Sequence, residues 1–288
     1  MNNKTPLVEI KDLSFTYSIA ETPALQNINL TIYEGEYVAL LGLNGAGKTT
    51  LLLTLNGVIP NMIMGDMYGA VLVGGIDTYD STVREMARTI GMVFDNPEFQ
   101  LSQMTVEEEV ALGLENLGIE HEEMLVEIDK ALATVGLLGV KGRSPFELSG
   151  GQQQRLAIAS ALAMQPKMLV MDEPTSNVDP IGKEEIFQTA RRLNREQGLT
   201  VVIAEHEVEV MALHADRIIV LDQGKILLNG TPSEVFAEVD TLKRLGLRPP
   251  QVTDMAHALQ SEGIIEAGEK PVTIDRAEAL LREAGVFG

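Results

Sequence analysis

The 288-residue chain contains no cysteine, which excludes disulfide bonds and cysteine-ligated metal sites and suits the cytosol. No stretch approaches the roughly 18 apolar residues that a membrane-spanning helix needs. The first six residues, Met1 to Pro6, contain no apolar signal core. We therefore expect any membrane association to go through partner proteins.

Basic residues are scarce as well. The 22 Lys and Arg are outnumbered by 42 Asp and Glu, so the formal net charge is −20. Proteins that follow nucleic-acid phosphates carry basic patches instead, and we expect no nucleic-acid partner. The hydrophobic fraction of 45% is ordinary for a globular protein, and a chain of this length can bury one large core or one core plus a small appendage.

A glycine-rich loop follows the apolar run Glu36 to Leu41, which we predict to be a strand. Gly42, Gly47, Lys48 and Thr49 fit the spacing G-x-x-x-x-G-K-[ST]. Glycines let consecutive backbone N–H groups curl around phosphate oxygens, and the next helix directs its positive end at the same anion. A plain turn before a core helix is the weaker interpretation, because strand, loop, Lys-Thr pair and helix occur in the required order.

The loop therefore predicts binding of a nucleoside triphosphate. Lys48 is expected to reach the β- and γ-phosphates and to take part in catalysis, and the Thr49 hydroxyl is expected to bind Mg²⁺. The predicted phosphate-loop contacts are Gly42, Asn44, Gly45, Ala46, Gly47, Lys48, Thr49 and Thr50.

Two carboxylates end the short apolar strand Met168 to Met171. Ligands of open α/β sheets bind at the carboxyl ends of the strands, where the phosphate loop also lies. Asp172 can therefore hold Mg²⁺, and Glu173 can act as general base toward an attacking water. Alone, a carboxylate pair before Pro174 would fit turn chemistry equally well, but the phosphate loop favours catalysis.

Two further side chains are candidates by position. His206 follows the predicted strand Thr200 to Ala204, at the same sheet edge, where an imidazole could hydrogen-bond a γ-phosphate. Most single histidines are structural or solvated, and only this location raises His206 above them. Tyr17 ends the first predicted strand and could stack on a purine base, although a lone strand tyrosine more often packs.

The remaining pattern gives the order of the elements. Leu7 to Tyr17, Ile28 to Ile32 and Thr89 to Phe94 are predicted strands, and Val71 is expected to begin another. The section from about 97 to 165 is predicted to be mostly helical, and its third helix opens at Leu148-Ser149-Gly150-Gly151-Gln152. Small residues before a helix start again describe an anion site.

Past Arg248-Pro249-Pro250, two short helices are predicted at about 254–262 and 274–284. We expect this tail to be too small to bury its apolar faces internally, so it should pack on the main domain or on another chain.

These motifs together resemble the ATPase subunit of an ATP-binding cassette (ABC) transporter over about residues 1–245. The resemblance rests on the phosphate loop, the signature Leu148 to Gln152, the Asp172-Glu173 strand end, the Asp179 loop and His206. It implies an α/β fold of the P-loop NTPase class, with a mixed sheet core, an antiparallel N-terminal β-subdomain and an inserted helical subdomain. The nucleotide-binding domain would be 1–246, its helical subdomain about 97–165, and 247–288 a small C-terminal extension that is a candidate dimerisation element.

The resemblance also implies a nucleotide sandwich in which two ATPase subunits face head to tail. Each ATP would lie between one phosphate loop and the opposing signature, with Mg²⁺ as cofactor. The implied roles are γ-phosphate binding in trans by Ser149, Gly150 and Gly151, adenine stacking by Tyr17, general base catalysis by Glu173, γ-phosphate sensing by His206 and coupling of the two sites by Asp179.

Within the family, Val93 to Gln100, Gly113 to Asn116 and the proline-containing tail resemble the energy-coupling factor group, which powers uptake of vitamins or of cobalt and nickel ions. The implied partners are a second ATPase subunit, identical or different, a transmembrane coupling subunit and a substrate-binding membrane subunit, at the cytoplasmic side of the cell membrane. The helical section would touch the membrane subunit, and we expect Phe94, Pro97, Phe99 and Leu101 to form an exposed apolar docking groove there.

One residue departs from the family. Asp95, a further predicted Mg²⁺ ligand, stands where the family usually has Gln, in the loop that contacts Mg²⁺ and the attacking water. It is one methylene shorter and brings a negative charge toward the triphosphate, which puts hydrolysis or its coupling in question. The alternatives are another ABC importer class, a soluble cassette ATPase that remodels nucleic acid or ribosomes, and a regulatory cassette that has lost turnover.

Overall fold

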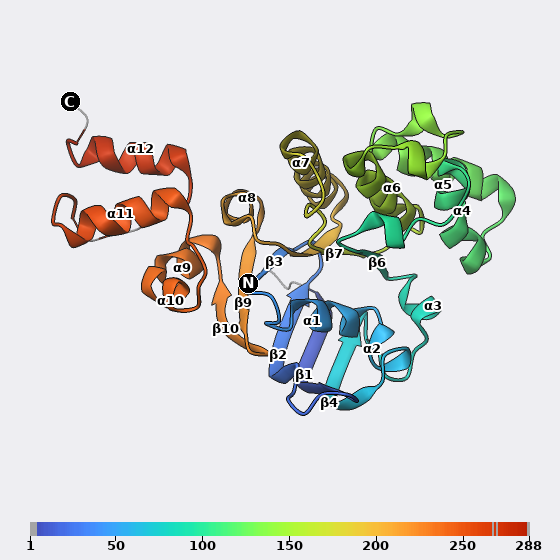
Figure 1. Ribbon diagram of the computed structural model, residues 1–288, viewed down its shortest axis with the longest axis horizontal. Helices are drawn as coiled ribbons and strands as arrows, with labels where there is room; N and C mark the ends of the chain where they lie inside the picture. Colours follow the sequence, from blue (N-terminus) through green and yellow to red (C-terminus); the bar gives the residue numbers. More distant parts are fainter. Residues whose placement is uncertain (1–4, 267, 269, 287–288) are drawn as a thin grey trace.

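The computed structural model describes residues 5–266, 268 and 270–286, so the first four residues of the N-terminal segment considered above lie outside the described part. Figure 1 shows two sheets in the middle of the molecule. A helical section and a C-terminal helical hairpin extend from them toward opposite ends of the long axis. The phosphate loop lies between these two arms.

The first sheet is antiparallel, with the strand order β2-β1-β4-β5. Its strands are β1 Pro6–Tyr17, β2 Leu25–Tyr33, β4 Gly65–Val73 and β5 Ile76–Asp77. The prediction that a strand begins at Val71 was wrong, because β4 begins at Gly65. A Cβ at Gly69 would collide with the carbonyl oxygens of Lys11 and Asp12, so glycine allows β4 to approach the irregular stretch of β1.

The second sheet has the strand order β10-β9-β3-β8-β7-β6, parallel except for the antiparallel pair β9 and β10. Its strands are β3 Tyr37–Leu41, β6 Ile90–Val93, β7 Met168–Asp172, β8 Thr200–Ala204, β9 Arg217–Asp222 and β10 Lys225–Gly230. Every residue of β3, β7 and β8 is buried, as expected for parallel strands covered on both faces. Their neighbouring carboxyl ends bring the phosphate loop, Glu173 and His206 to one edge.

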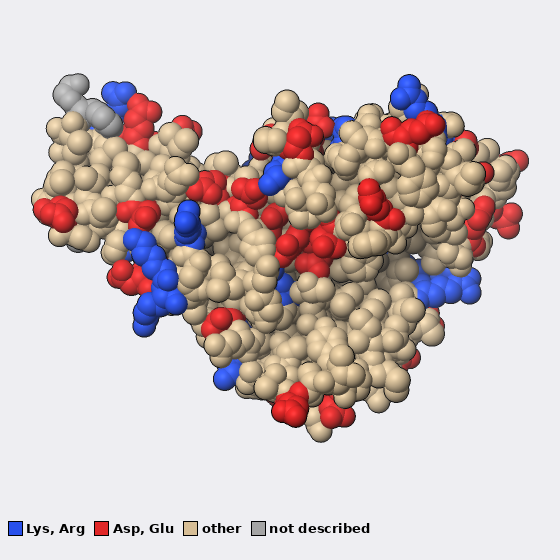
Figure 2. Space-filling view, in the orientation of Figure 1, with Lys and Arg blue, Asp and Glu red and all other residues tan. Residues whose placement is uncertain are grey.

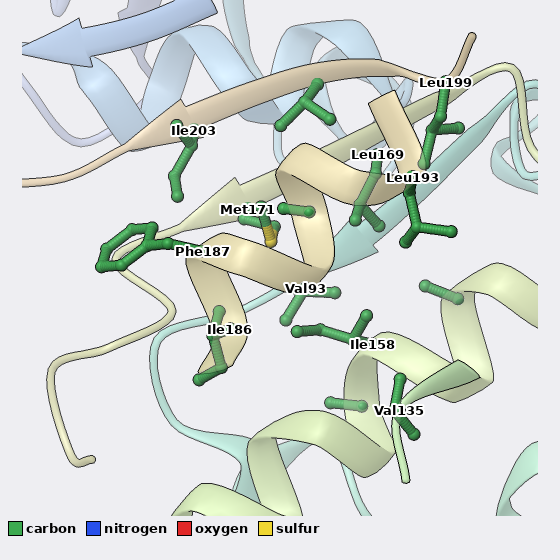
Figure 3. Close-up of a cluster of buried hydrophobic side chains, with 14 of the residues drawn as sticks. Val93, Val135, Ile158, Leu169, Met171, Ile186, Phe187, Leu193, Leu199 and Ile203 are labelled. Atoms are coloured by element: carbon green, nitrogen blue, oxygen red, sulfur yellow. The ribbon is translucent and has the colours of Figure 1, made fainter. Parts of the chain in front are cut away.

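Helices cover both faces of the parallel sheet. On one face, α1 Lys48–Leu55 shares a core with the antiparallel sheet through residues such as Leu51 and Leu52. On the other face lie α7 Pro180–Gln197 and α8 Val208–His214. Figure 3 shows Ile186 and Phe187 of α7 in the same buried cluster as Met171 and Ile203 of the strands. Two short helices lie in connections: α2 Val58–Asn61 between α1 and β4, and α3 Val83–Met86 between β5 and β6.

The helical section consists of α4 Val106–Leu117, α5 His121–Thr134 and α6 Gly150–Ala163, joined by short 3₁₀ turns at Leu138–Val140 and Pro145–Glu147. A third 3₁₀ turn, Pro97–Phe99, precedes α4. The buried residues of the helical section belong to the same core as the parallel sheet, and Figure 3 shows Ile158 of α6 close to Val93 of β6. This arm therefore shares its packing with the strands that carry the site.

The C-terminal arm begins with α9 Pro232–Ala237 and α10 Val239–Arg244 and ends with the hairpin of α11 Gln251–Ser261 and α12 Ile274–Glu283. The expectation that the tail cannot bury its apolar faces was wrong in part: Met255, Ile264 and Ile274 remain exposed, and Val272 packs on the main domain as expected. Ala256, Ile265 and Leu281 form a small separate core, because two amphipathic helices can cover each other's narrow apolar stripes. Within the described residues, no helix is long and apolar enough to cross a bilayer.

Candidate functional site

The phosphate loop connects β3 to α1 and borders a cavity of about 520 Å³. Gly47 has a left-handed backbone, with φ of 104°, and a Cβ there would lie 2.7 Å from the Ala24 carbonyl oxygen. Only glycine therefore fits at this point of the loop. The cavity wall includes Tyr17, Asn44 to Thr50, Phe94, Asp95, Asp172 and Glu173. Four separate chain segments thus meet where the sequence predicted a triphosphate.

Two of the predicted catalytic side chains, Lys48 and His206, contact the third, Glu173. The buried Lys48 donates its Nζ to the Gly42 carbonyl at 2.8 Å and lies 3.4 Å from Oε1 of Glu173. His206 donates from Nε2 to the same Oε1 at 2.8 Å. Glu173 itself has a left-handed backbone, with φ of 46°, which is strained for a residue with a side chain. The fold therefore holds the carboxylate between two nitrogen donors.

Asp172 and Thr49 provide oxygen ligands of the kind that Mg²⁺ prefers. Oδ1 of Asp172 is buried and has no hydrogen-bond partner among the described residues, as expected of an atom reserved for a cation. Burial raises the pKa of Asp172, the Thr49 hydroxyl bond lowers it, and the nearby charges of Glu173 and Asp95 raise it further. A bound cation would stabilise the ionised carboxylate of Asp172 against burial and the neighbouring charges, so Asp172 and Thr49 fit Mg²⁺.

Asp95 was also predicted to be a metal ligand. It is exposed at the cavity wall and close enough to Asp172 to affect its pKa. However, the described residues contain no group of three acidic or histidine side chains placed to hold a metal by themselves. A cation here would rely on Asp172, Thr49 and the nucleotide's own phosphates, and ligation by Asp95 stays a prediction.

The signature residues do not line the phosphate cavity of their own chain. Ser149 caps α6, accepting from the Gln152 backbone N–H, while the Gln152 side chain accepts from the Ser149 N–H. The first-turn N–H groups of Gly150 and Gly151 are thereby presented at a helix start, which favours an anion. Contribution to a second subunit's site stays a prediction.

Asp179 caps α7, where its Oδ1 accepts from the backbone N–H groups of Ile181 and Gly182 at 3.1 Å each. Tyr17 shares a hydrogen bond of 2.9 Å with the Thr50 hydroxyl and packs edge-on against Phe15. Both side chains therefore have structural roles in this chain. Their predicted roles in coupling and in adenine stacking are untested.

The family described as ABC transporter matches residues 25–176, from β2 through the phosphate loop and signature to the segment after Glu173. An ABC transporter ATP-binding protein of Pyrococcus horikoshii is 45% identical over 98% of this chain and 99% of its own length. This chain belongs to the ABC transporter family.

Other relatives of this ABC cassette indicate which group of ABC ATPases it resembles. The energy-coupling factor transporter ATP-binding protein EcfA1 of Caldanaerobacter subterraneus is 44% identical over 90% of this chain and 92% of its own length. The structure resembles CbiO1 of Clostridium perfringens, part of the CbiONQ transporter complex, with a TM-score of 0.74, 33% identity and coverage of 89% of this chain and all of that one. A dimeric cassette in a post-hydrolysis state with ADP and phosphate matches 78% of this chain, with 33% identity and a TM-score of 0.68.

One buried carboxylate of this ABC cassette was not predicted to matter. Glu205 is 4% exposed and accepts from the Thr175 hydroxyl and, at 2.7 Å, from the His206 backbone N–H. It thereby fixes the loop of His206 to the loop of Glu173. The available signal was an acidic residue that ends a fully buried strand immediately before the candidate histidine.

The proposed apolar groove at residues 94–101 was only partly correct. Phe99 is 89% exposed, but Leu101 is 4% exposed, Pro97 is buried and Phe94 is half-buried. The 3₁₀ turn at Pro97–Phe99 reverses the chain tightly enough to return Leu101 to the core and to leave Phe99 outside. Phe99 is therefore a single exposed residue and does not form a groove with the other three.

Proposed function

We propose that this chain is the ATP-hydrolysing subunit of an energy-coupling factor importer, and that it powers uptake of a vitamin or of a cobalt or nickel ion. It would work as a dimer with a second ATPase subunit, on the cytoplasmic side of the membrane, with a transmembrane coupling subunit and a substrate-binding subunit. The observation that carries the proposal is the contact of Lys48 and His206 with one carboxylate oxygen of Glu173 beside the phosphate loop.

The first step is binding of the triphosphate. Backbone N–H groups of residues 44–49 would surround its phosphate oxygens, and Lys48 would turn from Glu173 and Gly42 toward the β- and γ-phosphates. Mg²⁺ would neutralise charge that develops on the phosphates, held by Thr49 and Asp172. Because Lys48 is buried, its side chain has little freedom left to lose when it turns to the phosphates.

Binding also prepares the base. A γ-phosphate would compete with Glu173 for Lys48 and for His206, and both donors would move to the phosphate. The released carboxylate would then accept a proton from the attacking water. Glu205 keeps the His206 backbone fixed during this change, so only the imidazole has to rotate.

A second subunit would complete the site. The signature of each chain, capped by Ser149, lies outside its own phosphate cavity, so a head-to-tail dimer can place it on the partner's γ-phosphate. Gly150 packs against the backbone of Asn177, so the signature and the Asp179 loop would approach the partner together.

The membrane subunit would contact the helical section. A groove of about 430 Å³ lies between α3 and the end of α4 and is lined by Val83, Ala87, Leu117 and Met164, with Arg84 and Asn116 also in the lining. Phe99 stands exposed in the connection from β6 to α4. This mixed apolar and polar groove suits a short amphipathic helix of a membrane protein.

The charge distribution disfavours a cassette that acts on nucleic acid. Figure 2 shows acidic side chains across the middle of one face, while basic ones form small groups at its edges, beside α3 and at the base of the C-terminal arm. A nucleic-acid backbone needs a continuous basic track instead. The other alternative, a cassette that binds ATP without turnover, is favoured by one observation, the exposed carboxylate of Asp95 at the cavity wall.

An ATPase assay of the purified protein, alone and with candidate membrane subunits, tests the proposal. We expect Mg²⁺-dependent hydrolysis that changes when the membrane subunits are present. Nucleic-acid-stimulated hydrolysis would support the soluble alternative, and ATP binding without turnover would support the regulatory one. The substrate would follow from the identity of the membrane protein that co-purifies.

A further inference from the structure

The backbone of residues 94–95, here called the Phe94–Asp95 loop, is bound by side chains. It continues β6, the edge strand of the parallel sheet, so no neighbouring strand supplies partners on its open side. Gln100 accepts from the Phe94 N–H and donates to the Met92 carbonyl, each at 3.3 Å. The loop's own carbonyls are bound by two other side chains from distant parts of the chain.

Those two donors are Gln154 and Ser176. The Phe94 carbonyl accepts from Nε2 of Gln154 at 3.1 Å, and the Asp95 carbonyl accepts from the Ser176 hydroxyl at 3.0 Å. Gln154 belongs to α6, the helix that opens at the signature, and Ser176 lies three residues beyond Glu173. Two adjacent peptide carbonyls in the cavity wall are thus bound to the signature helix and to the loop of the base.

Gln154 is fully buried, and only half of its amide is used. Its Oε1 has no hydrogen-bond partner among the described residues. Burying an unpaired polar atom is unfavourable, and a leucine of similar volume would avoid that cost in a helix that faces the core. The amide therefore contributes a link to the Phe94 carbonyl that a better-packing residue could not provide.

We propose that Gln154 and Ser176 are positioning residues that couple the signature helix to the catalytic base through the Phe94–Asp95 loop. An occupant of the phosphate cavity sets the position of this loop. Gln154 passes that position to α6, and Ser176 passes it to the segment that holds Glu173. The inference rests on the proposed ATP hydrolysis, and neither side chain lines the phosphate cavity.

A double-mutant cycle tests the proposal in the full-length protein with its ATPase partner. Gln154→Leu and Ser176→Ala should each lower kcat about fivefold to tenfold and leave the Kd for ATP within about twofold, because neither side chain lines the phosphate cavity and both hold the loop in the position that the transition state needs. The double variant should lose no more than the stronger single variant, since both bonds hold the same loop. Ser176→Thr keeps the hydroxyl and should restore kcat.

Gln153→Leu is the matched control. Gln153 is also a buried glutamine of α6, but its Nε2 donates at 3.2 Å to the Pro145 carbonyl, within the helical section. In this variant kcat should stay within about twofold of wild type, and the Tm of both glutamine variants checks that each is folded. Equal loss of kcat in the two glutamine variants, or fully multiplicative losses in the cycle, would overturn the coupling role.

Hydrogen exchange separates this inference from the proposed function. In wild type, Mg²⁺-ATP should protect the phosphate loop, residues 94–100 and α6. In Gln154→Leu the phosphate loop should stay protected while the change in α6 is lost. This pattern with no hydrolysis in wild type would overturn the proposed function and support the link. Unchanged protection of α6 in Gln154→Leu would overturn the link, whatever the rate of hydrolysis.

Discussion

The two arms of the molecule are attached to the sheets in different ways. The helical section shares one continuous core with the parallel sheet, through residues such as Val110, Leu132 and Ile158. The C-terminal hairpin has a separate core of three buried residues. Its contacts with the preceding part of the chain include the ion pair of Lys243 with Asp254 at 2.6 Å, the approach of His257 Nε2 to the Asp240 carboxylate at 3.4 Å, and the packing of Val272 on the main core.

This difference indicates different uses. An arm that shares its core with β6 and β7 cannot move without shifting the strands that carry Asp95 and Glu173, so it can report or drive the state of the site. A hairpin with its own core can keep a constant shape while the site opens and closes. We therefore expect changes in the first arm to alter turnover or membrane coupling, and changes in the second to alter assembly.

The largest expected effect comes from a substitution in the catalytic site, which lies between the two arms. This substitution should leave both arms folded. Glu173→Gln keeps the shape of the side chain and removes the proton acceptor, so ATP turnover should fall by about 10² or more while ATP still binds. The measurement is the steady-state ATPase rate, with binding followed by nucleotide fluorescence. Equal rates in the two proteins would sink the assignment of Glu173 as base.

A charge on the first arm should break membrane coupling. Phe99 is 89% exposed and makes little contribution to the core, so Phe99→Asp should abolish co-purification with the membrane subunit without lowering Tm. ATP binding should be unaffected. Ile19→Asp is the matched control, since Ile19 is 97% exposed in the antiparallel sheet's connection. Retained assembly in Phe99→Asp would place the interface elsewhere.

The two arms also differ in how far the sequence could predict them. The phosphate loop, the signature and the helix boundaries could be predicted from the sequence, because glycine spacing and capping residues act locally. The placement of Lys48, Glu173 and His206 at one edge of the sheet needed only the rule that ligands gather at the carboxyl ends of parallel strands. Their order at that edge was not readable, because β3, β8 and β7 become neighbours only through long-range pairing.

Other features depended on tertiary packing. The short helix α8 was missed because seven residues give too weak a periodic signal. The hairpin core was missed because the apolar stripes of α11 and α12 are narrow and cover each other only when the helices are antiparallel neighbours. Gln154 and Ser176 carry no sequence signal of their own, since their partners are backbone carbonyls.

Removing the second arm should change assembly alone. A chain that ends before Pro249 keeps Leu247 packed on the main core and should fold and bind ATP. It should be monomeric without nucleotide, because the tail would otherwise hold two ATPase subunits at high effective concentration between cycles. Among the described residues of the tail, the exposed large apolar side chains that could form such a contact are Met255, Ile264, Ile274 and Val286.

Light scattering of nucleotide-free protein measures this effect. Ile274→Asp in the full-length chain should weaken the dimer while the hairpin core of Ala256 and Leu281 stays intact, which separates loss of contact from loss of fold. A truncated protein that remains dimeric, or a full-length protein that is monomeric with every plausible partner ATPase, would show that the tail has another role.

The smallest expected effect comes from a substitution of Asp95, at the boundary between the parallel sheet and the first arm. Asp95 is exposed at the cavity wall and brings a third carboxylate near Asp172 and Glu173. Asp95→Gln removes that charge, and its repulsion toward a triphosphate is worth about 1 kcal/mol in a solvated site. ATP hydrolysis by the complex should rise about fivefold, since about 1.4 kcal/mol corresponds to a factor of ten in rate.

The hydrogen bond from the Ser176 hydroxyl to the backbone carbonyl of residue 95 does not depend on the side chain at 95, so the arm's link to the base should survive the change. Rates measured for the reconstituted complex with and without Asp95→Gln decide the matter. Unchanged hydrolysis and transport would mean that the carboxylate points away from the phosphates and that this departure from the family is neutral.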